Sequence, residues 1–255
     1  MTDAVKNLGP IAIAALKTWN GIAKASLKTI NGITVSHAPT DPLFANVVLL
    51  QNFDGDLTDA KSHTVTAVGN AVYSTVRHKF GLGSCLLDGS GDEMSLADSA
   101  DWYMGAGDWT IEGHFYFATA WNTFNVIINQ YTGTLSTSFL YLDIRSSGTA
   151  INNVTAYGGS QDNLSGNPGL SLDTWYHICI ERFGTGLTLY VEGVSKATAS
   201  VSTHSYNDST GALEIGGCSV DSRWMAGNVG SMRITKGVAR YKGAFTPPSA
   251  KYPTA

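Results

Sequence analysis

The residues best suited to catalysis lie in one run, Gly107-Asp108-Trp109-Thr110-Ile111-Glu112-Gly113-His114-Phe115-Tyr116-Phe117. Glu112 and His114 are a carboxylate and an imidazole two positions apart, the side-chain types used for general acid–base catalysis. In an extended strand they share one face with the other even-numbered residues, while the odd-numbered aromatics share the opposite face. We therefore expect a strand with a core face and a wetter face.

Carboxylate spacing argues against hydrolysis. A retaining glycosidase needs two carboxyl groups about 5–5.5 Å apart, which two acidic residues on one face of a strand would provide. No Asp or Glu lies two positions from Glu112, Glu181 or Glu214, and the remaining glutamates, Glu93 and Glu192, stand far away. A Gly-x-Ser-x-Gly elbow, a phosphate loop and a His-Glu-x-x-His motif are also absent from the sequence. No catalytic residue is predicted, and we expect a core strand in a protein that is not an enzyme.

A cluster of acidic residues suggests calcium as the one cofactor to consider. Asp54, Asp56 and Asp59 stand in a Gly-containing turn and could supply oxygen ligands. The alternative is that these aspartates form the turn itself, through hydrogen bonds to the backbone.

Aromatic residues beside amides and carboxylates suggest sugar binding. Aromatic faces stack on the C–H surface of a sugar, and polar neighbours bind its hydroxyls. We expect a polar loop over residues 157–168, and loops of that length often have a binding role. The alternative for each aromatic residue is a place in the core or an oligomer contact. The candidate ligand-binding residues are Trp102, Tyr103, Trp121, Tyr157, Gln161, Asp162, Asn163 and Trp224.

Composition narrows the class of protein. Charged residues make up 14% of the 255 residues and hydrophobic residues 43%, which is typical of a globular chain. The net charge of −4 argues against nucleic-acid binding, and no apolar run is long enough for membrane insertion. Three widely separated cysteines, Cys85, Cys179 and Cys218, predict buried thiols without disulfides, as expected for a protein made in a cytoplasm.

The N-terminal segment differs from the rest. The run Leu16-Lys17-Thr18-Trp19-Asn20-Gly21-Ile22 recurs eleven residues later as Leu27-Lys28-Thr29-Ile30-Asn31-Gly32-Ile33. Each Asn-Gly predicts a tight hairpin turn. So short an element cannot bury its apolar side chains alone, so Trp19, Ile22, Ile30 and Ile33 are the expected attachment or oligomerisation residues. We expect residues 1–45 to form an attachment segment and residues 46–255 a separate domain.

The larger domain reads as all-β. Short strand-like runs separated by Gly-rich turns recur through residues 46–234, and none of that stretch shows a clear helical period. Such a pattern predicts a two-sheet sandwich or jelly roll. Trp175 and Tyr190 are expected to fill the space between the sheets, and Arg233 and Arg240 to bind carbonyl groups of the closing segment.

Several motifs together resemble a known family, the concanavalin A-like, laminin G-like jelly roll. They occur in family order across about residues 46–250: Phe53-Asp54-Gly55, the run 79–89, the run 107–113, Trp175-Tyr176-His177, the run 187–193 and Arg233-Ile234-Thr235-Lys236-Gly237-Val238-Ala239-Arg240-Tyr241. The last motif, followed by Phe245-Thr246-Pro247-Pro248, is most similar to the version found in bacteriophage virion and tail proteins.

The resemblance, taken with the missing carboxylate pair, predicts a function without catalysis. It suggests a homo-oligomeric virion structural protein that binds other virion proteins through its N-terminal segment. The jelly roll would be displayed on the particle, as a tail fibre or capsid decoration, and would bind a host-surface glycan. The alternative is a carbohydrate-active enzyme or a free lectin on the same fold.

Overall fold

The computed structural model describes residues 40–118, 120–145, 148–157 and 159–255, together with four short strands nearer the N-terminus. The chain divides into two compact units, residues 1–40 with Ala255, and Asp41–Thr254. Among the described residues, no helix is both long and apolar enough to cross a bilayer.

The N-terminal unit contains two small hairpins. Strand β1 (Thr18–Trp19) pairs with β2 (Ile22–Ala23), and β3 (Thr29–Ile30) pairs with β4 (Ile33–Thr34). Trp19 lies opposite Ile22 and Ile30 opposite Ile33, as the Asn-Gly turns predict. The side chains of the four expected attachment residues fall outside the described part of the structure, so their role stays a prediction.

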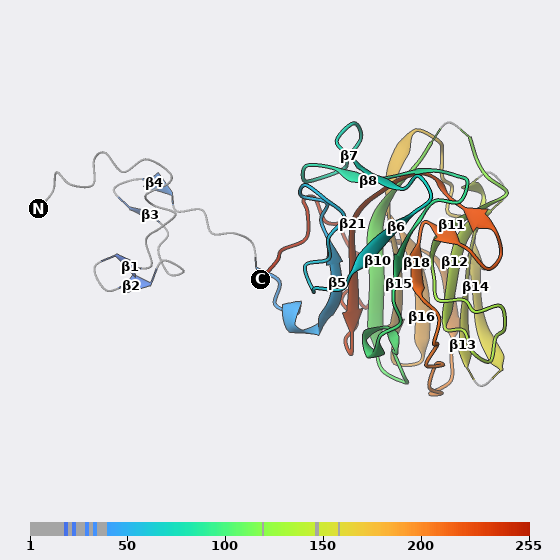
Figure 1. Ribbon diagram of the computed structural model, residues 1–255. Coiled ribbons are helices and arrows are strands. Elements are labelled where there is room, and N and C mark those ends of the chain that lie inside the picture. The colour runs from blue at the N-terminus through green and yellow to red at the C-terminus, as the bar shows by residue number, and fades with distance from the viewer. Residues whose placement is uncertain are drawn as a thin grey trace, which may run out of the picture. The chain divides into compact units, whose positions relative to one another are not determined.

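Two large antiparallel sheets form the second unit, which confirms the predicted all-β jelly-roll sandwich (Figure 1). The eight-stranded sheet runs in the order β17 (Val194–Ser200), β16 (Gly186–Val191), β15 (Thr174–Phe183), β10 (Trp109–Phe117), β21 (Ala226–Lys236), β8 (Ser84–Asp88) and β7 (Val72–Ser74), and β5 (Val47–Gln51) also pairs with β21. The seven-stranded sheet runs in the order β14 (Ser160–Gly166), β13 (Ala150–Tyr157), β12 (Leu140–Arg145), β11 (Phe124–Asn129), β18 (Leu213–Ile215), β9 (Glu93–Leu96) and β6 (Val65–Val68).

Short elements complete this unit. Strand β19 (Gly217–Cys218) pairs with β20 (Arg223–Trp224) in a separate small hairpin. Two single-turn 3₁₀ helices, η2 (Phe44–Asn46) and η3 (Ala100–Trp102), precede β5 and β10.

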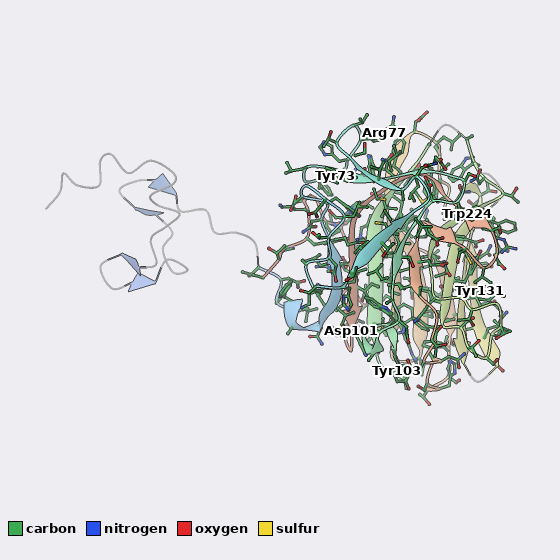
Figure 2. The ribbon with its side chains drawn as sticks, in the orientation of Figure 1. Tyr73, Arg77, Asp101, Tyr103, Tyr131 and Trp224 are labelled. Carbon is green, nitrogen blue, oxygen red and sulfur yellow. The ribbon has the colours of Figure 1, made fainter. Side chains whose placement is uncertain are left out.

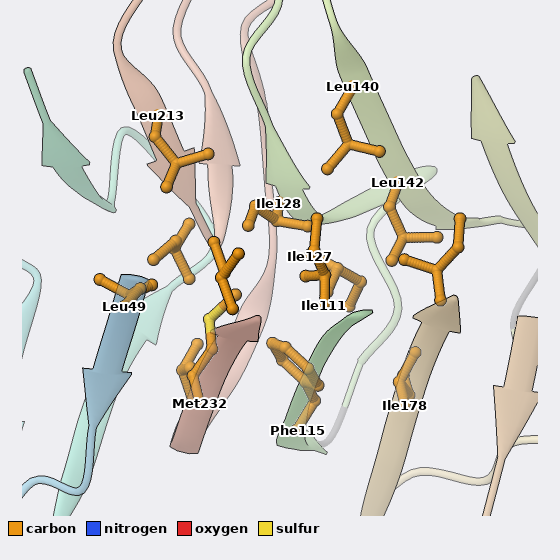
Figure 3. Packing of buried hydrophobic residues seen from close by; sticks show 14 of the residues in the cluster. Leu49, Ile111, Phe115, Ile127, Ile128, Leu140, Leu142, Ile178, Leu213 and Met232 are labelled. Atoms are coloured by element: carbon orange, nitrogen blue, oxygen red, sulfur yellow. The ribbon is translucent and has the colours of Figure 1, made fainter. Parts of the chain in front are cut away.

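The core lies between the two sheets. Ile111 and Phe115 on β10 face Ile128 on β11 and Leu142 on β12 (Figure 3). The predicted core face of residues 107–117 is therefore confirmed. The three cysteines are free and buried, as expected.

The opposite face of β10 corrects the prediction of a wetter surface. Every residue of β10 is buried, because the C-terminal segment (residues 239–252) packs over this face. Tyr241 stacks on Phe245 with ring centroids 3.5 Å apart, and Tyr252 is 2% exposed. The even-numbered side chains alternate as predicted, but they enter a second buried layer.

Glu112 is the centre of that second layer. It accepts hydrogen bonds from Nε and Nη2 of Arg233 at 2.9 and 2.7 Å and from the Tyr241 hydroxyl at 2.5 Å, and its carboxylate lies 3.1 Å from Nε2 of His177. Burial alone would raise its pKa, but the His177 hydrogen bond and the Arg233 charge hold the pKa at about 2. Glu112 is thus an ionised structural residue, covered from solvent.

The other polar residues of this layer also have structural partners. Arg233 and Arg240 bind the Asp41 carboxylate, at 2.9 and 2.7 Å, where carbonyl partners were expected. Trp175 and Tyr190 lie on this outer face too, against Tyr116 and Phe245 respectively, so their expected place between the sheets was wrong.

Candidate functional site

A pocket of about 180 Å³ opens on the outer face of the seven-stranded sheet, and we call it the tyrosine pocket. Its polar and charged lining comes from the loop between β11 and β12, from β12 and β14, and from the β19–β20 hairpin. It is lined by Tyr131, Leu135, Ser138, Phe139, Leu140, Tyr141, Arg145, Val154, Gln161, Asp221 and Arg223. The combination of aromatic rings with amide, carboxylate and guanidinium groups is the lining expected of a small-ligand site.

Strand periodicity places the pocket's side chains. On β12, Leu140, Leu142 and Ile144 enter the core, so Tyr141, Asp143 and Arg145 share the opposite face. Tyr141 meets Tyr131 edge to face, with ring centroids 5.6 Å apart. This contact fixes both rings beside the pocket.

The β19–β20 hairpin supplies Arg223. Its guanidinium lies 3.9 Å from the centroid of the Phe124 ring, and its Nη1 donates to the Tyr141 hydroxyl at 3.3 Å. Nη1 also lies 3.0 Å from the Asp221 carboxylate. Arg223 therefore joins β11, β12 and the hairpin at the pocket wall.

A second hollow, of about 310 Å³, adjoins the pocket and shares Arg223 with it. We call it the tryptophan hollow because Trp224 forms one side. Its other lining residues are Gly89, Ser90, Asn122, Thr123, Phe124 and Ser222. Figure 2 shows Tyr131 and Trp224 on the same side of the sandwich, and Arg223 lines both hollows.

Two buried glutamates support the hairpin from below. Glu214 accepts hydrogen bonds from N and Oγ of Ser219, at 3.1 and 2.5 Å, and Asn129 donates to the Gly217 carbonyl at 2.5 Å. Glu93 lies beside Glu214, and its pKa is raised to about 7, first by burial and then by the negative charge of Glu214.

Close packing here requires glycine at residue 217. A Cβ atom at this position would lie 2.5 Å from Trp224 Cδ1 and 2.6 Å from Glu93 Oε2. The absence of a side chain thus lets Trp224 lie directly over Glu93.

The buried aspartate of the pocket is Asp143. Its carboxylate lies 2.6 Å from Nε of Arg145, and its side chain is fully buried while that of Arg145 is 36% exposed. Burial raises the pKa of Asp143, although Arg145 opposes the shift.

Two of the predicted ligand-binding residues line this surface, and a third, Asn163, contacts one of them. Gln161 lines the tyrosine pocket and donates to Asn163 at 3.0 Å, and Trp224 lines the tryptophan hollow. The expected polar loop over 157–168 is largely strand β14, paired with β13, so this part of the prediction was wrong. It is an edge strand that presents alternate polar side chains.

The other predicted residues lie elsewhere. Trp102 is 1% exposed and donates to the Ala97 carbonyl, so it belongs to the core and offers no face to a ligand. Trp121 packs on Phe117 with ring centroids 4.8 Å apart. Asp162 accepts a hydrogen bond from the Tyr206 hydroxyl at 3.0 Å.

Tyr103 and Tyr157 complete the predicted set. The hydroxyl of Tyr103 contacts Ser205 at 3.0 Å at the far end of the sandwich, away from Tyr131 and Trp224 (Figure 2). Tyr157 ends β13, and its side chain is outside the described residues.

The three turn aspartates do not converge. Asp54 lies 2.5 Å from Lys251 Nζ, Asp56 accepts two hydrogen bonds from Thr58, and Asp59 binds backbone amides that include that of Leu50. Within the described part of the chain, no group of three His, Cys, Asp or Glu side chains is arranged to hold a metal ion. Asp56 and Asp59 therefore bind backbone amides, the alternative considered from sequence, while Asp54 forms an ion pair with Lys251.

Sequence reasoning missed Tyr131, Tyr141, Arg145 and Arg223. A signal was present, because Tyr141, Asp143 and Arg145 alternate with three aliphatic residues along one predicted strand. It also missed the Glu93–Glu214 pair, because carboxylates were compared only within a strand and these two come from neighbouring strands.

Solved structures with a similar fold include domain 4 of AbnA, a GH43 extracellular arabinanase from Geobacillus stearothermophilus, in complex with arabinotriose. It is 13% identical, with a TM-score of 0.56 over 76% of this chain and 94% of that one. The binding domain of botulinum neurotoxin serotype D is 16% identical, with a TM-score of 0.58 over 78% and 50%. The binding domain of Paraclostridial Mosquitocidal Protein 1 is 11% identical, with a TM-score of 0.59 over 77% and 50%.

These likenesses concern the fold alone, and the match spans about half the length of the two toxin domains. A search of the curated proteins finds no match. A family model described as the concanavalin A-like lectin/glucanases superfamily, of laminin G type, matches residues 88–240. That range is more than half of the chain and contains most of both sheets. The chain therefore belongs to the concanavalin A-like lectin/glucanase superfamily.

Proposed function

We propose that the protein is a non-enzymatic glycan-binding module, displayed on a bacteriophage particle as a tail-fibre or capsid-decoration domain. The tyrosine pocket and the tryptophan hollow form its glycan-binding surface. The short N-terminal segment attaches it to other virion proteins.

The observation that carries the proposal is the lining of the tyrosine pocket. Tyr131 offers aromatic surface backed by Tyr141, and Gln161, Asp221 and Arg223 offer hydrogen-bond donors and acceptors around it. A sugar ring needs both kinds of partner, because one side of the ring is largely C–H and its edge carries hydroxyls. The fold of an arabinanase domain solved with arabinotriose adds support.

The Glu93–Glu214 pair supports binding over hydrolysis. These two carboxyl groups lie close together, as a glycosidase requires, but they are only 3% and 7% exposed. Glu214 is engaged by Ser219, and the Gly217–Trp224 hairpin covers Glu93. A substrate would have to displace the hairpin to reach them. The alternative is a carbohydrate-active enzyme or a free lectin. The enzyme would release reducing sugar, and the free lectin would function without attachment to a particle.

Placement on a virion rests on the N-terminal repeat and the C-terminal motif. The repeated Asn-Gly hairpins form a unit of their own, which suits a segment that binds a neighbouring protein. Immunogold labelling of particles from a host that produces this protein would test the location, and label confined to the host cytoplasm would contradict it.

A glycan array probed with the full chain tests the binding function. Tyr131→Ala removes aromatic surface from the pocket and is expected to abolish the array signal. Tyr103→Ala, at the far end of the sandwich, is the matched control and should keep it. An array without hits for the unmodified protein, or equal loss in both variants, would refute the proposed site.

A further inference from the structure

We infer that the tyrosine pocket selects a sugar residue that carries a carboxylate, such as a uronic acid, over its neutral counterpart. The inference rests on the proposed glycan-binding function and names the class of ligand. Two guanidinium groups and their unused donors carry the argument.

The two guanidiniums, Arg145 and Arg223, converge on a single aromatic ring. Their Cζ atoms lie 4.9 and 3.9 Å from the centroid of Phe124. Both arginines also line the tyrosine pocket, so two positive charges border it. An anion in the pocket would be attracted by both of them.

The existing carboxylates leave donors available. Asp143 engages Nε of Arg145, and Asp221 and the Tyr141 hydroxyl both engage Nη1 of Arg223. Among the described residues, neither Nη atom of Arg145 has a hydrogen-bond partner, nor do Nε and Nη2 of Arg223. A guanidinium donates through a planar fork, and a carboxylate is the group that matches this fork.

The distribution of charge at the surface also favours an anion. Asp143 is fully buried, whereas Arg145 and Arg223 are 36% and 31% exposed. Asp221, 28% exposed, is the accessible carboxylate of the pocket and lies on the Arg223 side. The pocket therefore presents more positive than negative charge to a ligand.

The size of the pocket limits what enters. Its volume of about 180 Å³ is below the 300–1,000 Å³ of typical drug-sized sites. A single sugar ring is the expected occupant, with its carboxylate toward the two arginines. Gln161, on the β14 side, would then bind a ring hydroxyl.

The experiment compares matched glycans on an array probed with the full chain. Each uronic-acid glycan is printed beside its carboxyl-reduced form, which keeps the ring and the linkages but loses the charge. We expect at least tenfold stronger binding to one or more acidic glycans than to their reduced forms. Raising the salt concentration should weaken this preference.

Two variants and a control assign the preference to the pocket. Arg223→Gln and Arg145→Gln should each reduce the acidic-to-neutral ratio at least fivefold. Lys79→Gln, which removes a charge from the loop between β7 and β8 on the other sheet, should leave the ratio unchanged. Thermal unfolding of each variant checks that it is folded.

The outcomes separate this inference from the proposed function. Binding of neutral glycans as strong as that of acidic ones, or a preference unchanged in both arginine variants, overturns the inference and leaves glycan binding intact. Binding to no glycan of either kind overturns both.

Discussion

At the scale of single residues, the two side chains of β10 best suited to catalysis lie in the interior. Glu112 and His114 have the types and spacing of catalytic groups, yet both are buried beneath the C-terminal segment. Burial, followed by the nearby His177 charge, lowers the pKa of His114 to about 3, so it stays neutral at physiological pH. A neutral imidazole and a fully bonded carboxylate in the interior are packing elements.

Arg233 forms ion pairs with two buried carboxylates, those of Glu112 and Asp41, and balances their negative charge. Replacing it with alanine leaves both acids without this charge partner, and breaking a buried ion pair typically costs 3–5 kcal/mol. We expect Arg233→Ala to lower the free energy of unfolding by about that amount in urea titrations.

The control for this experiment is Lys251→Ala, whose ion pair with Asp54 has side chains 48% and 36% exposed. Both charges of this pair reach water, so a loss below about 1 kcal/mol is expected. Equal losses in the two variants would contradict the structural role given to Arg233.

The raised pKa of Glu93 predicts an unusual dependence of protein stability on pH. Its pKa is raised to about 7 in the folded protein, so the folded state binds a proton more tightly than the unfolded state. This contribution to stability is fully present below the unfolded pKa of about 4.5 and is lost as pH rises through 7. The free energy of unfolding should therefore fall between pH 5 and pH 8.

Glu93→Gln should flatten this part of the stability profile, because the amide does not titrate. Glu112 contributes with the opposite sign: its pKa is lowered to about 2, so its contribution is lost as pH falls below about 4.5. A slope between pH 5 and 8 that persists unchanged in Glu93→Gln would show that another group causes it.

At the scale of elements, the alternation of inward and outward side chains along a strand was predictable from the sequence. Which segment would cover the outer face of a sheet was not. The inward residues of β10 and β12 follow from period-two patterns in the sequence. The outer face of β10 is buried by a segment more than 120 residues later in the sequence, and no local pattern of β10 encodes that cover.

The candidate site illustrates the same limit. Its aromatic, polar and charged residues come from the loop between β11 and β12, from β12 and β14, and from the β19–β20 hairpin, which only the fold brings together. The sequence therefore identified Gln161, Asn163 and Trp224 as ligand-binding candidates, but it could not show that Arg223 would join them to Tyr141.

The β19–β20 hairpin is the element most sensitive to a small change. Gly217→Ala places a methyl group against Trp224 and Glu93, at distances that require the hairpin to shift. We expect a loss of about 1–3 kcal/mol in stability, a changed tryptophan fluorescence spectrum and weaker glycan binding.

Gly159→Ala is a suitable control, because a Cβ atom at residue 159 would meet no atom within 4 Å. Gly159 has a positive φ of 82°, so a small strain cost is expected there without any effect on tryptophan fluorescence. Full glycan binding by Gly217→Ala would show that the hairpin does not position the site.

At the scale of the whole molecule, the separation into two units suggests a division between attachment and recognition. Residues 1–40 and Asp41–Thr254 form separate compact units, and the smaller unit has too little chain to bury a core alone. Light scattering after size exclusion should show an oligomer for the full chain and a monomer for residues 41–255. A monomer in both cases would refute a role of the N-terminal unit in assembly.

The place of Asp41 has a mechanical consequence. Asp41 is the first residue of the larger unit, and its carboxylate is held by Arg233 on β21 and by Arg240 beyond it. If the protein is tethered through residues 1–40, a pull on the tether reaches these two buried ion pairs before it reaches any strand of the sandwich. β21 pairs with β10, β8 and β5. A pulling force on β21 is therefore distributed over several strands of the sheet. Single-molecule stretching of Asp41→Asn should then show a lower rupture force than the unmodified chain.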